Sequence, residues 1–293
     1  MSNIIAVVVT HNRKDLLLQN IKCLLKQEVK TDILVVDNLS TDGTFNELRG
    51  YIKSKKIIYY PTKRNLGGAG GFSAGILEAC KLGYDYLWLM DDDCMPCPKS
   101  LSMLINYAHY LNNEFGFLSS QVLWKNNALS KMNIQKKTPF TKNTDFHSSL
   151  VKIQMATFVS LLIKSSTIKK VGLPIKEFFI WADDLEYTRR ISVLYPCYLV
   201  NSSKVKHNTP LNIGSNIALD EACNLNRYKY AYRNEVYVYK REGILGMFYI
   251  IIRLIDHLLR IIFKSRDNKI KRLNIILKST LHGITFNPKI NKI

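Results

Sequence analysis

The sequence predicts an α/β fold, with a mixed, mostly parallel sheet flanked by helices and a C-terminal helical extension. Residues 4–9 form an unbroken apolar run rich in β-branched side chains, which is typical of a buried parallel strand. A helical pattern of apolar residues over 14–27 and a second apolar run at 33–36 follow directly. This order of strand, helix and strand predicts a βαβ unit.

Composition agrees with a folded protein that meets an anionic partner. The 293 residues are 47% hydrophobic and 11% aromatic, which favours a sizeable core and excludes disorder. The net charge of +19 indicates nucleic acid, an anionic membrane surface or a phosphorylated substrate. Residues 220–293 hold 15 Lys or Arg but only 6 Asp or Glu. We therefore expect a main domain over 1–219 and a basic helical segment over 220–293.

The cysteines and the N-terminus indicate a cytoplasmic protein. Six cysteines are scattered along the chain, with no pattern of a disulfide framework. Cys94 and Cys97 form a CxxC pair, but a zinc site would need a second pair or nearby histidines in sequence. The N-terminal apolar run is too short for a signal peptide.

The first two predicted strands end in polar loops that carry candidate ligand-binding residues. Asp37 ends the run at 33–36, where a carboxylate can accept hydrogen bonds from a ribose or a base. The alternative is that Asp37 or Asp42 caps the helix that follows, and for Asp42 we favour the cap.

A glycine-rich loop follows a third predicted strand at 57–60. Gly67, Gly68, Gly70 and Gly71 allow backbone N–H groups to approach a ligand closely, and Arg64 adds a cation. A helix predicted over 72–81 would point its N-terminus at the same place, as in a diphosphate cradle. The loop matches neither the GxGxxG fingerprint nor a P-loop. The alternative is a flexible hinge or tight turn.

A fourth predicted strand, rich in aromatics, runs into three acids, Asp91, Asp92 and Asp93. Alternation along the backbone points Asp91 and Asp93 one way and Asp92 the other. Adjacent carboxylates need a compensating cation, so the pattern favours a hard divalent ion on Asp91 and Asp93. A solvated acidic turn or a helix cap is the alternative. Further elements are predicted as a helix over 99–110, a strand over 117–123, one or two strands within 151–163 and a short strand over 198–201.

A second acidic centre begins at Trp181. Asp183, Asp184 and Glu186 follow it at the start of a predicted helix. A carboxylate beside a Trp-bearing apolar wall can have a raised pKa and act as a general base. The alternative is that these acids only stabilise the helix, through the favourable interaction of a negative charge with the N-terminal end of the helix dipole. His207 comes 23 residues after Asp184, and a single histidine of this kind is usually structural.

The C-terminal segment contains a long apolar pattern at 244–263. Four charged or polar residues interrupt it and disfavour a membrane span, namely Arg253, Asp256, His257 and Arg260. Their spacing puts them on one face of an amphipathic helix, which would lie on a membrane surface or against the main domain. A basic cluster follows, formed by Lys264, Arg266, Lys269, Lys271 and Arg272.

Together, these motifs resemble the inverting family-2 glycosyltransferases with the GT-A fold. The resemblance covers residues 4–210 and rests on the motifs THNR, VDNLSTDGT, RNLGGAGG, MDDD, WADDLEY and the later histidine. It is most similar to the bacterial galactofuranosyltransferases, and rhamnosyltransferases share much of it. It implies a galactofuranosyl donor, or alternatively dTDP-rhamnose, and a glycan or lipid-linked acceptor. It disfavours a non-catalytic nucleotide-sugar or nucleic-acid binding protein, and we expect no nucleic-acid partner.

The resemblance also implies residue roles. Asp37 would bind the uridine, Asp184 would be the catalytic base, and Mn²⁺ or Mg²⁺ would be the cofactor. Donor contacts would come from Thr10, Arg13, Arg64, Asn65, Gly67, Gly68, Gly70, Gly71 and Asp92. Metal ligands would be Asp91, Asp93 and His207, and acceptor contacts would come from Trp181, Asp183 and Glu186. The expected place is the inner face of the plasma membrane, and the short basic tail favours a single-addition enzyme over a polymerase.

Overall fold

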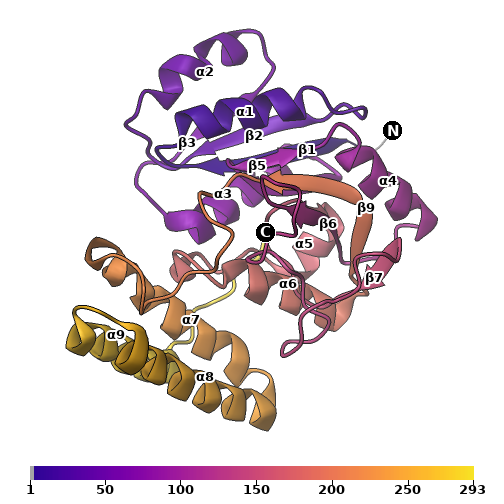
Figure 1. Ribbon diagram of the computed structural model, residues 1–293. Coiled ribbons are helices and arrows are strands. Elements are labelled where there is room, and N and C mark those ends of the chain that lie inside the picture. Colours follow the sequence, from indigo (N-terminus) through magenta and orange to yellow (C-terminus); the bar gives the residue numbers. More distant parts are fainter. Residues whose placement is uncertain (1–2) are drawn as a thin grey trace.

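The computed structural model describes residues 3–293 (Figure 1), and within them nine strands form one sheet. The strands are β1 (Ile4–Thr10), β2 (Asp32–Asp37), β3 (Ile58–Pro61), β4 (Tyr86–Asp91), β5 (Cys94–Pro96), β6 (Phe117–Leu123), β7 (Leu150–Lys152), β8 (Leu161–Lys164) and β9 (Tyr198–His207). The α-helices are α1 (Lys14–Leu24), α2 (Thr44–Lys53), α3 (Gly67–Lys81), α4 (Ser100–Tyr110), α5 (Ser165–Val171), α6 (Asp183–Leu194), α7 (Tyr228–Lys240), α8 (Gly243–Lys264) and α9 (Lys269–Thr285). Two short 3₁₀ helices are η1 (Lys176–Phe178) and η2 (Ala222–Arg227).

The sheet is mixed, as predicted, and its order is β3-β2-β1-β4-β8-β6-β9-β5, with β7 paired to β9 outside this order. Strands β3, β2, β1 and β4 are mutually parallel, and β8 runs antiparallel to both β4 and β6. The register pairs Thr10 with Asp37 and Val9 with Asp91. The carboxyl ends of these parallel strands therefore lie at one edge, where ligands bind in open α/β sheets.

Both faces of the parallel strands β1, β2 and β4 are buried, which explains the unbroken apolar run of β1. Ala6 and Val8 pack in a core with helices α1, α2 and α4. Ile5 and Val7 point the other way, into a core with α3. In Figure 1, α1 and α2 lie on one side of β1–β3 and α3 on the other.

Helix α3 begins at Gly67, five residues before the predicted start at 72. The sequence predicts a loop for the glycine run, but residues 67–71 are helical and serve packing. A Cβ on Gly71 would lie 2.6 Å from Val9 Cγ1, and one on Gly75 would lie 2.7 Å from Val7 Cγ1. The glycines therefore let α3 approach the sheet closely.

Other boundaries differ because pairing across the sheet decides them. The strand predicted over 198–201 continues to His207, since its second half pairs with β6 and with β5. Strand β5 was missed, because three residues directly after an acidic turn carry no periodic signal. The region 151–163 holds the end of β7 and the start of β8, separated by a loop.

The C-terminal helices α7, α8 and α9 lie side by side beneath the sheet domain in Figure 1. Residues Val236–Tyr239 of α7 share a core with Phe178 and Met155. The tail after α9 also returns to the sheet domain, where Leu173 N donates to Asn291 O at 2.8 Å. Among residues 3–293, no helix is long and apolar enough to cross a membrane.

Candidate active site

Three carboxylates meet the end of β1 at the ligand-binding edge of the sheet. Thr10 Oγ1 donates to Asp92 Oδ2 at 2.7 Å. Arg13 Nη1 donates to Asp93 Oδ2 at 2.8 Å and to Asp92 Oδ1 at 3.3 Å. Asp92 thus turns toward the end of β1, and Arg13 neutralises part of the charge of the acidic turn.

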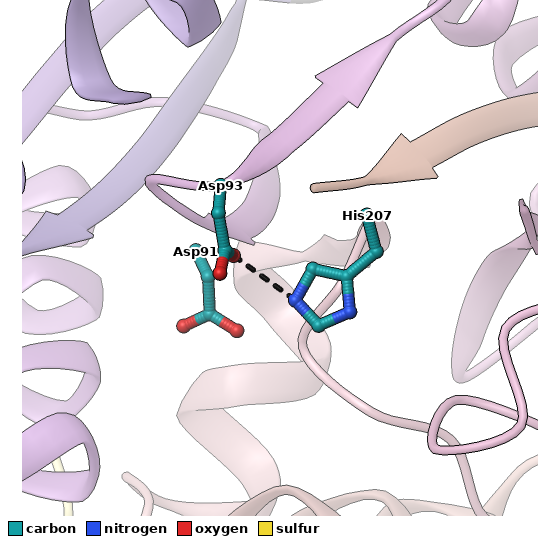
Figure 2. Close-up of side chains that lie close together, drawn as sticks. All are labelled: Asp91, Asp93 and His207. Carbon is teal, nitrogen blue, oxygen red and sulfur yellow. Dashed lines mark hydrogen bonds and ion pairs between the residues drawn. The ribbon is translucent and has the colours of Figure 1, made fainter. Parts of the chain in front are cut away.

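Asp91, Asp93 and His207 form a cluster that could hold a metal ion. One ligand atom from each lies within 4.8 Å of the others. Strand β5 brings them together, since Cys94 pairs directly with His207 across the antiparallel ladder. In Figure 2 the two carboxylates and the imidazole converge, and His207 Nε2 lies 3.0 Å from Asp93 Oδ1.

The donor set fits Mn²⁺ or Mg²⁺. Carboxylate oxygens suit both ions, and an added imidazole nitrogen is a common ligand of transition metals. His207 Nδ1 lies 2.8 Å from the side-chain oxygen Oδ1 of Asn133. An N–H at Nδ1 leaves Nε2 with a lone pair that faces a carboxylate. Two acceptors at that distance need a proton or a cation between them.

The charges of this turn perturb one another strongly. Burial, and then repulsion from Asp93, raise the pKa of Asp91 to about 7. Burial also raises the pKa of Asp92 to about 6. Burial opposes the charged form of His207, but the hydrogen bond and charge of Asp93 outweigh it and raise the His207 pKa. A divalent cation would relieve this repulsion.

Asp37 lies at the same edge, at the end of β2, and is 3% exposed. Its Oδ2 accepts a hydrogen bond from Tyr59 Oη at 2.6 Å, and its Oδ1 accepts one from Ser40 N at 2.8 Å. Asp42 accepts from Thr44 N and from Lys14 N, so it ties together the starts of α1 and α2. Asp42 therefore has a local structural role, but the N-cap of α2 is Gly43 and not Asp42.

The glycine loop is shaped by two asparagines. Asn38 Nδ2 donates to Gly67 O at 3.0 Å and to Asn65 Oδ1 at 3.1 Å, and Asn65 Oδ1 also accepts from Gly67 N. A Cβ on Gly70 would meet Leu66, whereas one on Gly68 would meet nothing within 4 Å. Gly68 is therefore the open position of the run, and the nearby Arg64 is exposed.

The second acidic centre begins α6. Asp183 is buried, and burial, then repulsion from Asp184 and a smaller effect of Asp91, raise its pKa well above the usual range. Burial raises the pKa of Asp184 to about 6, opposed by the Leu185 N–H that bonds its carboxylate and by the charge of Lys136. Burial is thus the main cause of both pKa shifts.

The other acceptor-side residues differ in their surroundings. Glu186 forms a bidentate ion pair with Arg190, with N–O distances of 3.0 and 2.7 Å, so its carboxylate is engaged within α6. Trp181 packs against Tyr228, with ring centroids 5.0 Å apart, and Arg227 lies over its ring. Trp181 is therefore held by the start of α7.

Sequence reasoning missed several residues around the site. Asn133 lies in a stretch without periodicity, and its contact with His207 spans 74 residues. Tyr59 and Asn38 were assigned only to a strand and a loop. These contacts have no signal within their own stretches of sequence.

The family model described as Glycosyl transferase family 2 matches residues 5–160, more than half of the chain. The chain belongs to glycosyl transferase family 2. It is therefore a glycosyltransferase, and the family suggested by the sequence motifs is confirmed. The match contains the acidic turn and the glycine loop but ends before Asp184 and His207.

Two relatives are named galactofuranosyltransferase. The chain is 31% identical over 217 residues to galactofuranosyltransferase GlfT1 of Mycolicibacterium smegmatis, covering 66% of this chain and 70% of that protein. It is 30% identical over 210 residues to GlfT1 of Mycobacterium tuberculosis H37Rv, covering 64% of each. The chain thus spans about two thirds of the length of these relatives.

Solved structures confirm the GT-A-type fold. Residues 1–349 of S. aureus TarS match with a TM-score of 0.57 and 13% identity, over 94% of this chain and 71% of that chain. GalNAc-T7, in a structure with UDP, GalNAc and Mn²⁺, matches with a TM-score of 0.59 and 15% identity, over 82% and 50%.

Proposed function

We propose that this enzyme transfers galactofuranose from UDP-galactofuranose to a lipid-linked or surface polysaccharide acceptor, with inversion at the anomeric carbon. The observation that carries the proposal is the pairing of two centres. The cluster of Asp91, Asp93 and His207 could hold a metal ion, and a buried acid pair begins α6, where the charge of Asp91 adds to the raised pKa of Asp183. The two relatives named galactofuranosyltransferase support the choice of donor sugar.

Inversion by direct displacement needs a base on one side of the sugar and charge neutralisation on the other. Asp91, Asp93 and His207 would hold Mn²⁺ or Mg²⁺, which when bound neutralises the departing diphosphate as a Lewis acid. Asp184, with a pKa near 6, is largely ionised at neutral pH yet basic enough to accept the proton of an acceptor hydroxyl. Asp183 and Trp181 would line the acceptor side, and Glu186, paired with Arg190 within α6, would support the helix that begins at Asp183.

The donor nucleotide would lie along the edge between β1, β2 and α3. Asp37 would face the uridine, with Tyr59 orienting its carboxylate. Gly68 offers the open backbone position for a phosphate, beside the exposed Arg64. Thr10 and Arg13 would act through Asp92, whose orientation they fix.

The test is product analysis with purified enzyme and a lipid-linked acceptor. UDP-galactofuranose and dTDP-rhamnose are supplied separately, with Mn²⁺ or after chelation by EDTA. We expect transfer only from UDP-galactofuranose, with inverted configuration and loss on chelation. Transfer from dTDP-rhamnose alone would instead identify a rhamnosyltransferase.

We also propose that α8 and α9 bind an anionic bilayer, at the inner face of the plasma membrane. Helix α8 is packed with its charged side inward. Arg253 Nε lies 2.9 Å from Glu235 Oε1 on α7, and His257 Nε2 lies 3.6 Å from Glu235 Oε2. The apolar side faces outward, with Ile244 77% and Phe263 79% exposed. One face of α8 thus packs on the protein, and the exposed apolar face supports the proposal of a membrane contact.

Basic side chains gather at a second surface of the C-terminal helices. A groove of about 880 Å³ between α7 and α9 is lined by four lysines, Lys229, Lys269, Lys271 and Lys278. No acid lines it, so it suits lipid phosphates. Arg272 was expected in this basic cluster but is 2% exposed, since it bonds Asp267 and the carbonyl oxygens of Ile217 and Asp220. It supports the fold instead.

A further inference from the structure

The turn that leads into the acid pair is strained. Three non-glycine residues have left-handed backbone conformations within four positions, namely Phe179 at φ 63°, Trp181 at φ 68° and Ala182 at φ 63°. Side chains with a Cβ disfavour this region, so such a turn persists only where its surroundings impose it. The next two residues are Asp183 and Asp184.

One side chain of α7 holds this turn. Asn234 has no exposed surface. Its Nδ2 lies 3.0 Å from Phe178 O, 3.1 Å from Ile180 O and 2.9 Å from Trp181 O. An amide has two hydrogens, so they are shared among three carbonyl groups of the turn.

Arg233 fixes the orientation of this amide. Asn234 Oδ1 accepts from Arg233 Nε at 3.0 Å and from Nη2 at 2.8 Å. Arg233 Nη2 also donates to Glu177 O at 2.6 Å. Because Arg233 can only donate, the oxygen of Asn234 faces it and the NH₂ group faces the turn.

The opposite side of the turn contacts the glycine loop. Phe179 O accepts a hydrogen bond from Ala69 N at 3.2 Å, in the first turn of α3. A Cβ on Gly67 would lie only 2.0 Å from Phe179 O. The turn is therefore clamped between α7 and the start of α3, and it joins the donor side of the edge to the acid pair.

We propose that Asn234 is a positioning residue for glycosyl transfer, which holds the strained turn so that Trp181, Asp183 and Asp184 keep their places. This inference rests on the proposed role of Asp184 as the base. Asn234 does not touch the reacting atoms, so it acts through the turn. The C-terminal segment then contributes to catalysis as well as to membrane binding.

The experiment compares Asn234→Ala with Asn201→Ala. Asn201 is also buried and donates to Ser148 O at 2.6 Å, on a strand outside the turn. Displacement of a catalytic group by about 1 Å can cost on the order of a hundredfold in rate. Well below the melting temperature, we expect Asn234→Ala to lower kcat by ~100-fold and to change the Kd for UDP by less than about threefold. Asn201→Ala should keep kcat within about threefold.

Hydrogen exchange provides a readout that does not depend on activity. In Asn234→Ala, exchange should accelerate in peptides covering residues 178–186 and remain unchanged in β1 and β4. Uniform acceleration, or an unchanged kcat with normal exchange, would overturn the proposal. If the wild-type enzyme transfers no sugar, the proposed function fails. The exchange result still tests whether Asn234 holds the turn, so failure of the proposed function can be told apart from failure of the Asn234 proposal. If Asn234→Ala does not fold, Arg233→Ala, which frees the amide to rotate, should give a smaller change in the same peptides.

Discussion

The hydrogen bond between Asn133 and His207 offers a sharp test of the proposed metal centre. Asn133 is 5% exposed and His207 8% exposed, so the bond of 2.8 Å between Oδ1 and Nδ1 is shielded from water. We expect it to keep the proton on Nδ1 and the lone pair of Nε2 toward the metal. Loss of such a supporting bond weakens metal binding by about 10- to 100-fold. This corresponds to about 1.4–2.8 kcal/mol.

Two substitutions of Asn133 test the hydrogen bond, one by removing it and one by strengthening it. Asn133→Leu has a similar shape and excludes water, so it should reach the upper end of the range. Asn133→Asp supplies a stronger acceptor for Nδ1–H and should retain or tighten metal binding. The measurement is calorimetric titration of Mn²⁺ in the presence of UDP, paired with the Mn²⁺ dependence of transfer.

The control is Ser130→Ala. Ser130 Oγ donates to the same Asn133 oxygen at 2.6 Å but does not contact His207. If both Ser130→Ala and Asn133→Leu weaken Mn²⁺ equally, the effect reflects local packing. If Asn133→Leu binds Mn²⁺ as tightly as wild type, the reasoning about His207 is wrong.

Three other predictions follow from the structure. Because the pKa of Asp184 is about 6 and the base must be ionised, kcat/KM should fall tenfold per pH unit below about pH 6. Asp184→Asn should abolish transfer and retain UDP binding. Full activity of this variant would exclude Asp184 as the base. Ile252→Asp, on the exposed face of α8, should reduce sedimentation with anionic vesicles, whereas Val193→Asp, exposed on α6, should not; equal binding by both variants would count against the α8 surface. Gly71→Ala should lower the free energy of unfolding by about 1–3 kcal/mol through overpacking against β1. Gly50→Ala, in open space on α2, should raise the free energy by about 0.4–1 kcal/mol in the same denaturation assay.

Much of the fold could be predicted because the parallel strands β1, β2 and β4 are buried on both faces, whereas the edge strand β3 is partly exposed. The runs that became β1, β2 and β4 are apolar throughout, and the polar residue after each run marks the ligand-binding edge. Helix α3 shows the limit of this approach. Glycine lowers helix propensity, so the sequence predicts a loop for the glycine run. The contribution of these glycines to packing depends on Val7 and Val9 of β1.

The candidate site likewise contains residues that the sequence reveals and residues that it does not. Charged side chains at strand ends, such as Asp91 and Asp93, can be found from the sequence because they interrupt an apolar pattern. Neutral amides such as Asn133 and Asn234 cannot, since asparagine is common in loops and helices alike. Their importance comes from partners 74 and 53–56 residues away, which only the folded chain reveals.

Several contacts attach the C-terminal helices to the sheet domain, including the ion pair of Arg189 with Glu242. Asn234 joins α7 to the turn before α6, and Asn291 joins the tail after α9 to Leu173. A layer fixed at both ends cannot swing as a hinged arm would. If α8 lies in the bilayer, the catalytic edge stays at one height and one tilt above the lipid. Only a sugar at a matching distance from the membrane would then reach Asp184, so the anchor would select acceptors by their length.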